Sequence, residues 1–162
     1  MHTWTIQSES VAAAGVEDAL WEYAAEVARR VWGRSATESE LREAMKNDPH
    51  DDLAPPHGMF LAARADDGAL LGYVGVRLLA EAPATAEIKR MYVRPTGRGT
   101  GLGRGLLLAA EAAARGLGAA RIVLETNTRL TEARAMYEAH GYAETAPYND
   151  HDAAEHWYGK PL

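Results

Sequence analysis

Apolar side chains in the first third of the chain recur at helical spacing. Between residues 20 and 31 they fall three or four positions apart, with acidic residues before them and two arginines at the end, which predicts a helix. Residues 3–7 alternate like a short strand ahead of it. A second helix is expected to begin near Thr37, whose hydroxyl and Glu40 fit a capping box, and to end at the Pro- and Asp-rich loop of residues 47–58.

Alternation with a period of two takes over in the middle of the chain. Residues 59–65 and 70–79 predict the two strands of a hairpin, because the Asp67-Gly68 pair between them is a turn signal. Pro83 predicts the next turn, and residues 85–94 supply a third strand that mixes charged with apolar side chains.

Helical spacing then returns and alternates once more with a strand. Residues 102–117 predict a helix, residues 121–126 predict a short strand, and Thr131 is expected to cap a last helix that stops at Gly141. The aromatic tail is expected to close the sheet with two strands. Because no repeat and no linker divides the chain, we expect one domain over residues 1–162, of mixed α/β class.

Composition removes several classes of protein. The chain has 162 residues, no cysteine and a formal net charge of −6. The missing cysteine excludes disulfide scaffolds, thiolate metal sites and a cysteine nucleophile, and the acidity counts against general nucleic-acid binding. The histidines lack metal-ligand spacing, so no metal is expected. Because the chain shows neither a signal peptide nor the roughly 20 apolar residues of a membrane span, we expect a cytoplasmic protein without membrane contact.

Residues 88–110 differ from the rest of the chain in both charge and glycine content. They carry a charge of +5 and no acidic residue, so the other residues together carry −11. The basic residues are Lys89, Arg90, Arg94, Arg98 and Arg104, and the glycines are Gly97, Gly99, Gly101, Gly103 and Gly105. Such a loop lets backbone N–H groups approach an anion, and the helix that follows adds partial positive charge. The window therefore predicts a phosphate site.

Glycine spacing tests which phosphate ligand fits the loop. A Walker loop needs Gly-Lys five residues after a first glycine, and no such pair occurs. A Rossmann fingerprint needs glycines at positions i, i+2 and i+5, and the third is missing, although Glu125 after the next strand could serve as the ribose-binding acid. A Rossmann-like nucleotide site stays a minor alternative. A flexible turn with a solvated basic rim is the plain structural alternative.

The motif Arg98-Gly-Thr-Gly101-Leu-Gly103 resembles the Q/R-x-x-G-x-G/A signature of the GNAT superfamily of N-acetyltransferases. The resemblance continues through ARIVLET, EARAMYEAHGY and the terminal HWYGKPL, and thus covers the second half of the chain. It implies the GNAT fold, with a mostly antiparallel sheet, helices on both faces, and a splay between strands 85–94 and 121–126 that forms a slot for pantetheine. It also implies direct transfer of an acetyl group from acetyl-CoA to a primary amine.

The resemblance implies a role for each residue of the glycine-rich loop and of the strand before it. Backbone N–H groups from Arg98 to Arg104 would hold the pyrophosphate, and residues of the strand would contact the pantetheine arm and polarise the thioester carbonyl. The implied cofactor-binding residues are Met91, Tyr92, Val93, Arg98, Gly99, Thr100, Gly101, Leu102, Gly103 and Arg104.

Two side chains are candidates for moving protons. Tyr137 lies on the apolar face of the last predicted helix, where a core role is the alternative, and the resemblance makes it the acid that protonates the departing thiolate. Glu87 is a candidate base for the amine, or else a partner for a neighbouring cation. One position departs from the family: Leu130 stands where many relatives have Asn, and Asn127 lies three residues earlier.

The acceptor is expected to be a small-molecule or peptide amine that is cationic, because an acidic surface raises the local concentration of a cation. The resemblance places the acceptor side on the first two helices and the closing strands, which hold Trp21, Trp32, Glu81, Tyr148, Asp150 and His151. A homodimer is common among relatives, and no residue here places an interface. A non-catalytic acyl-CoA-binding module remains the alternative from another functional class.

Overall fold

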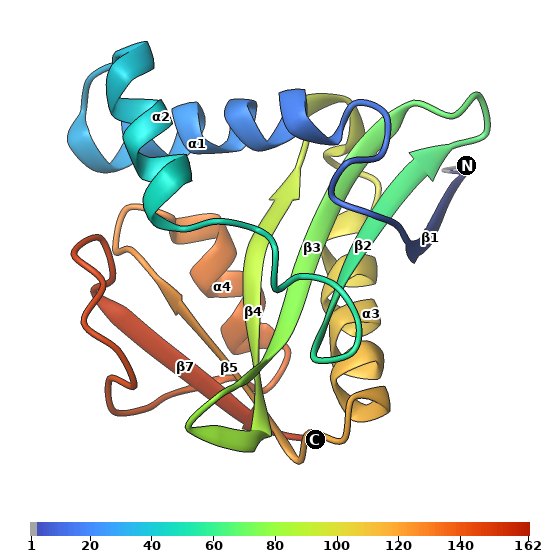
Figure 1. Ribbon diagram of the computed structural model, residues 1–162, viewed down its shortest axis with the longest axis vertical. Coiled ribbons are helices and arrows are strands. Elements are labelled where there is room, and N and C mark those ends of the chain that lie inside the picture. The colour runs from blue at the N-terminus through green and yellow to red at the C-terminus, as the bar shows by residue number, and fades with distance from the viewer. Residues whose placement is uncertain (1–2) are drawn as a thin grey trace.

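The computed structural model describes residues 3–162 as a seven-stranded sheet with helices on both faces (Figure 1). The strands are β1 (Trp4–Ser8), β2 (Gly58–Ala65), β3 (Leu70–Leu79), β4 (Ala82–Val93), β5 (Arg121–Thr126), β6 (Ala143–Glu144) and β7 (His156–Pro161). The helices are α1 (Val16–Trp32), α2 (Glu38–Asn47), α3 (Leu102–Gly116) and α4 (Thr131–Ala139), with the 3-10 turn η1 at Pro95–Gly97. Residues 3–162 contain no helix that is long and apolar enough to cross a bilayer.

Strand order in the sheet is β1-β2-β3-β4-β5-β7-β6, and β4–β5 is its parallel pair. The other neighbours are antiparallel, because hairpins join β2 to β3 and β3 to β4 while α3 carries the chain across between β4 and β5. The predicted mixed, mostly antiparallel architecture is therefore confirmed. The Rossmann-like alternative is wrong, since that fold requires a parallel sheet.

Two apolar cores cover the two faces of the sheet. The larger packs α3 and α4 against strand residues such as Ile88 and Leu124, and the smaller packs the start of α1 against residues such as Tyr73 and Tyr92. Ribbons show α1 and α2 together at one end of the sheet and α3 behind β2 and β3 (Figure 1). This arrangement leaves the carboxyl ends of β4 and β5 between α1 and α4.

Several boundaries predicted from local sequence signals are confirmed. The capping box at Thr37 is present, with the Glu40 N–H donating to the Thr37 hydroxyl at 3.1 Å and the Glu40 carboxylate accepting from the Thr37 N–H at 2.9 Å. Gly141 adopts the left-handed conformation with φ 89°. Asp67-Gly68 forms the predicted hairpin turn, with Gly68 at φ 89°.

Two predicted boundaries were wrong. Pro83 lies inside β4 rather than in a turn, because the register shifts between Leu78 and Leu79, and a bulged stretch of strand has no need of a proline N–H. Thr131 is the first residue of α4 rather than its cap. Leu130 occupies the cap position without a side-chain bond, and the turn before α4 is held instead by the Asn127 side chain, which accepts from the Arg129 N–H.

A bulge and a splay open the sheet at β4. Arg90 has φ 59°, and the three residues of β3 from Tyr73 to Gly75 face four residues of β4 from Tyr92 to Lys89, so β4 holds one extra residue here. The extra residue reverses the alternation of side chains beyond it, so Met91 faces the α4 side while Tyr92 packs toward α1. Pairing of β4 with β5 ends at Glu87, as the predicted splay requires.

Candidate active site

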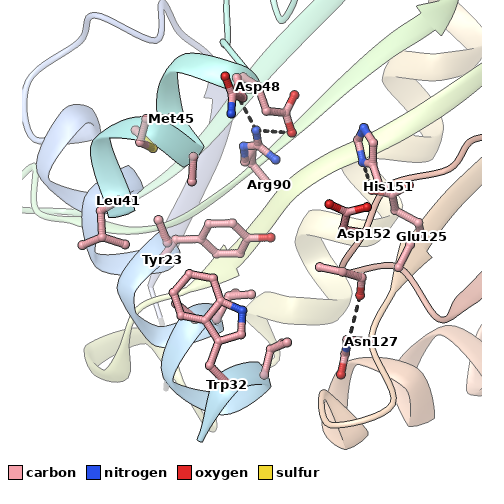
Figure 2. A pocket seen from close by; sticks show the side chains of 18 of the residues that line it. Tyr23, Trp32, Leu41, Met45, Asp48, Arg90, Glu125, Asn127, His151 and Asp152 are labelled. Atoms are coloured by element: carbon pink, nitrogen blue, oxygen red, sulfur yellow. Dashed lines mark hydrogen bonds and ion pairs between the residues drawn. The ribbon is translucent and has the colours of Figure 1, made fainter. Parts of the chain in front are cut away.

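Two adjoining cavities lie beside the opened part of β4. The first, of about 440 Å³, lies between the diverging ends of β4 and β5 and is bordered by α1 and α4; we call it the strand cavity. The second, of about 420 Å³, lies between α1, α2 and residues 151–154 (Figure 2), and we call it the helix cavity. Both have the size of small-ligand sites. The residues that line both cavities are Tyr23, Val27, Arg90, Glu125, Thr126 and Leu130.

The glycine-rich loop before α3 presents a row of free backbone donors. Within residues 3–162, no protein group accepts a hydrogen bond from the N–H of residues 99 to 104. Gly99 and Gly101 have φ 75° and 79°, and a Cβ at either position would meet no atom within 4 Å, so the loop is open to a ligand. The Thr100 hydroxyl donates to the Gly97 carbonyl at 2.6 Å and braces the turn. This row suits a phosphate or pyrophosphate group.

Arg98 differs from the other predicted loop residues. Its N–H donates to the Pro95 carbonyl at 3.3 Å, and its guanidinium donates to the Glu26 carboxylate at 3.0 Å. Arg98 and Gly103 line the strand cavity, so the loop adjoins that cavity. The Leu102 side chain is buried in the larger core and contributes its N–H alone. The free donors therefore begin at Gly99, one residue later than predicted.

The basic window is largely neutralised by acids from other elements. Lys89 and Arg90 pair with Asp48, at 3.2 and 2.6 Å. Arg94 pairs with Glu22 and Arg98 with Glu26, both from α1. No described residue forms an ion pair with Arg104. Because the other four cations are paired, residues 88–110 present far less free charge than the formal charge of +5 in their sequence. Attraction for a phosphate thus comes mainly from backbone dipoles.

Strand β4 lines the strand cavity with the three residues that the resemblance indicated, Met91, Tyr92 and Val93. Beyond Glu87 this edge of β4 has no partner in β5, so its backbone faces the cavity. The Tyr92 hydroxyl donates to the Glu22 carboxylate at 3.2 Å, and burial raises the Tyr92 pKa to about 12. Tyr92 is therefore held against α1, and the backbone of β4 is the part open to a ligand.

Tyr137 reaches the strand cavity from α4. Its ring packs against Tyr142 and Tyr158, and its hydroxyl lies 3.8 Å from the Met91 sulfur. Burial raises the pKa of the Tyr137 hydroxyl, so it stays protonated at neutral pH. A protonated hydroxyl beside β4 can donate a proton to a group bound in the strand cavity.

Glu87 lies outside both cavities. Its carboxylate is 1% exposed, accepts from Arg77 at 2.9 Å, and accepts from the Tyr148 hydroxyl at 2.6 Å. A buried carboxylate that is engaged twice is poorly placed to take a proton from an amine. The prediction of Glu87 as the base gains no support from this geometry, and the alternative of an ion pair is realised with Arg77 rather than with Lys89 or Arg90.

The position where many relatives have Asn lies at the boundary of the two cavities. Leu130 lines both of them. Asn127 does not replace the missing amide, because its Nδ2 donates to the Ala153 carbonyl at 2.9 Å and its Oδ1 accepts from Arg129. Asn127 therefore anchors residues 151–154 beside the helix cavity.

Of the six predicted acceptor-side residues, the structure brings Trp32 and His151 to the helix cavity. Trp21, Tyr148 and Asp150 are not among its lining residues, and Glu81 is exposed in the turn between β3 and β4. Sequence reasoning did not assign several polar lining residues to the acceptor side, among them Tyr23, Asp48, Glu125 and Asp152. The one available signal was Glu125 at the end of a strand, which the Rossmann comparison had singled out for a different ligand.

Charges around the helix cavity are arranged on two sides (Figure 2). On one side Arg90 pairs with Asp48 and its Nε lies 3.0 Å from the His50 ring nitrogen. Burial acts to raise the Asp48 pKa, but Arg90 and Lys89 outweigh it and hold that pKa at about 2. Burial, with Arg90 beside it, lowers the His50 pKa, so this histidine is neutral at pH 7.

On the other side of the helix cavity, the Glu125 carboxylate accepts from the Asn149 amide and contacts the His151 ring, and Asp152 lies beside them (Figure 2). Tyr23 points its hydroxyl across the cavity toward this group. Within residues 3–162 no group of three or more His, Asp or Glu side chains could hold a metal ion.

Comparison with known proteins agrees with this geometry. The model of the acetyltransferase (GNAT) family matches residues 18–142. An uncharacterised N-acetyltransferase of Schizosaccharomyces pombe is 35% identical over 117 residues, which cover 72% of this chain and 71% of that protein. An IAA acetyltransferase of Azospirillum brasilense is 35% identical over 112 residues, which cover 68% of this chain and 72% of that protein.

Solved structures share the fold over nearly the whole chain. A GNAT-family acetyltransferase of Staphylococcus aureus superposes with a TM-score of 0.74 at 17% identity, covering 99% of both chains. The PaiA N-acetyltransferase of Thermoplasma acidophilum, solved in complex with coenzyme A, superposes with a TM-score of 0.66 at 22% identity, covering 99% of this chain and 100% of that one. With its open β4–β5 pair, its free N–H row before α3 and these matches, the chain belongs to the GNAT family of acetyltransferases.

Proposed function

We propose that this acetyltransferase moves the acetyl group of acetyl-CoA directly to the primary amine of a cationic small molecule or peptide. The observation that carries the proposal is the meeting of two cavities. The strand cavity runs from the free N–H groups of residues 99–104 to Tyr137, and the helix cavity joins it at Glu125. One cavity fits a phosphorylated donor and the other a cation, and their shared boundary is where the two reacting groups would meet.

Donor binding would rest on the backbone rather than on charged side chains. The N–H groups of residues 99–104 would hold the pyrophosphate, and the free edge of β4 at Met91 and Val93 would bind the pantetheine arm. Acetyl-CoA supplies the activated thioester. A backbone N–H on the thioester carbonyl would stabilise the negative charge that develops as the amine attacks. The relative solved with coenzyme A has this fold and supports the proposed donor.

Tyr137 would act as the acid of this reaction. The ammonium form of the acceptor would first lose one proton to solvent or to a nearby carboxylate, which frees the nitrogen lone pair. As the carbon–nitrogen bond forms and the carbon–sulfur bond breaks, the hydroxyl of Tyr137 would give its proton to the sulfur and the nitrogen would lose its second proton to solvent. Tyr137 would then regain a proton from solvent. No residue needs to form a covalent intermediate, in keeping with the absence of cysteine.

A ligand screen followed by an amine panel tests the proposal. Acetyl-CoA or CoA at about 100 times its dissociation constant stabilises the protein by about 2.7 kcal/mol, whereas NAD at the same concentration is expected to leave the melting temperature unchanged. CoA release is then measured with a panel of amines. Binding without CoA release for every amine would indicate the non-catalytic acyl-CoA-binding module instead.

Tyr137→Phe tests the proposed acid. Turnover is expected to fall about 10²-fold with KM for acetyl-CoA little changed, because the variant loses the proton donor and keeps the ring. Tyr73→Phe is the matched control: it also removes one buried hydroxyl, which donates to the Ala19 carbonyl at 3.1 Å, from a side chain that lines neither cavity. Full turnover in Tyr137→Phe would remove Tyr137 from the mechanism.

A further inference from the structure

The helix cavity is walled mainly by apolar side chains. Helices α1 and α2 contribute Ala24, Val31, Trp32, Leu41, Ala44 and Met45. Trp32 is 48% exposed at this wall, an unusual state for so large an apolar side chain, and the Arg34 guanidinium stacks over its ring at 5.0 Å. A bound apolar group would take this surface out of water.

Most charged groups at the helix cavity are already paired within the protein. Glu40 pairs with Arg34 at 2.8 Å, and Asp48 pairs with Arg90 and Lys89. The acids left to meet a cation are Glu125, which contacts the neighbouring His151 ring, and Asp152, for which no described residue supplies an ion-pair partner. Both lie on the side away from α2 (Figure 2). The carboxylates that can meet an ammonium group therefore lie on one side of the cavity, and an ammonium on the α1–α2 side would face the apolar wall unpaired.

The boundary of the two cavities holds one carboxylate and one hydroxyl that can bind an amine. Glu125 and Tyr23 line both cavities. No described residue exchanges a hydrogen bond with the Tyr23 hydroxyl, and it points across the helix cavity toward the side that holds Glu125 (Figure 2). A carboxylate binds the ammonium form of the acceptor, and a hydroxyl can accept from or donate to the same nitrogen.

We infer that the acceptor is a primary monoamine with an apolar body, whose amino group is held by Glu125 and Tyr23 while its body lies against α1 and α2. This inference rests on the proposed acetyl transfer and narrows its substrate class. Polyamines, amino sugars with several charges and lysine-rich peptides would each bring further charges to the apolar wall.

An acceptor panel tests the substrate class. We expect kcat/KM for 2-phenylethylamine and n-hexylamine to exceed that for spermidine and kanamycin by at least tenfold. If the protein acetylates the amines but has the higher kcat/KM for spermidine or kanamycin, the inference is overturned and the proposed acetyl transfer is retained. CoA release with none of the amines, in protein that binds acetyl-CoA, would overturn the proposed function itself.

Variants at the boundary test the proposed amine contacts. In Glu125→Gln and Tyr23→Phe, KM for 2-phenylethylamine is expected to rise about tenfold, while KM for acetyl-CoA stays within twofold. Both changes preserve side-chain volume, and a melting temperature within a few degrees of the original shows that folding is intact. Unchanged KM for the amine in both variants would contradict the assignment.

A size-dependent variant tests where the apolar body lies. Ala24 lines the helix cavity and not the strand cavity, so a larger side chain there would take space from the apolar body of the acceptor. Ala24→Leu is therefore expected to raise KM for 2-phenylethylamine at least fivefold and KM for ethylamine less than twofold. Ala112→Leu, on the exposed side of α3, is the matched control and is expected to change neither value. Equal changes for both amines in Ala24→Leu would show that the body does not lie against α1.

Discussion

Arg90 occupies left-handed backbone, with φ 59°, where a residue other than glycine is uncommon. Its guanidinium pairs with Asp48 at 2.6 Å and donates to the Asp48 carbonyl at 2.8 Å. These bonds tie the bulge of β4 to the end of α2, and they offset the backbone strain at Arg90. Asp48 thus connects the strand proposed to bind the donor to the helix that walls the helix cavity.

Asp48→Asn is expected to lower the free energy of unfolding by about 1–2 kcal/mol at pH 7, a range that allows for the partial exposure of Asp48. The folded pKa of about 2 lies below the ordinary 3.8, so the stabilisation is complete above about pH 4 and disappears as the pH falls toward 2. Urea unfolding at pH 7, 4 and 2.5 measures this difference.

The exposed Asp66, for which no ion pair is found, supplies the control Asp66→Asn, which should leave the free energy of unfolding unchanged. A difference between Asp48→Asn and the original protein that is as large at pH 2.5 as at pH 7 would show that the carboxylate charge is not the cause.

At the scale of elements, the loop between η1 and α3 was the part most accurately predicted from sequence. Its glycines, its position after a strand and the apolar helix that follows are all local features. Positive φ at Gly99 and Gly101 turns successive N–H groups outward, and the open start of α3 extends the row to Arg104. Local conformation alone is therefore enough to build the row of free N–H groups proposed to bind phosphate.

Gly101→Ala is expected to weaken CoA binding at least tenfold and to lower stability by about 1 kcal/mol, because φ 79° is costly for any residue with a Cβ. Gly116→Ala is the control. Gly116 ends α3 without positive φ and with no atom within 4 Å of a Cβ, so the change should raise stability by up to about 1 kcal/mol and leave CoA affinity unchanged. Calorimetric titration with CoA and urea unfolding separate the two effects, and equal CoA affinity in both variants would contradict the role of the loop.

At the scale of the whole molecule, charges that lie apart in the sequence come together in the fold, so the net charge of −6 is not divided between a basic window and an acidic remainder as the sequence indicates. Glu22, Glu26 and Asp48 pair with four of the five cations in the window of residues 88–110, with Asp48 shared between Lys89 and Arg90. Apart from the buried Glu87 and Glu111, most of the remaining acids lie at the surface, and Glu125 and Asp152 line the helix cavity. The protein as a whole should therefore attract a cationic acceptor more than it attracts an anionic donor.

Raising NaCl from 0.1 to 1 M shortens the screening length from about 10 to 3 Å. We expect KM for a cationic amine to rise at least twofold in steady-state assays, since long-range attraction to the acidic surface is lost. KM for acetyl-CoA is expected to change less, because backbone dipoles act at contact distance. An amine KM that does not depend on salt would argue against an electrostatic contribution to acceptor binding.

The assignment of residues 1–162 to a single domain, the cytoplasmic location and the homodimer stay predictions. The domain assignment includes Met1 and His2, which lie outside the described residues.

The sequence by itself determined the family, the class of fold, the glycine-rich loop and the helix that carries Tyr137, because each depends on residues close together in the chain. Tertiary structure alone decided the rest of the site. Glu87 pairs with Arg77 ten residues away, and the cavity boundary joins Tyr23, Arg90 and Glu125 from three separate elements. The spacing of apolar residues can predict which face of a helix or strand such residues occupy. Which charged side chains meet depends on how the helices pack over the opened sheet.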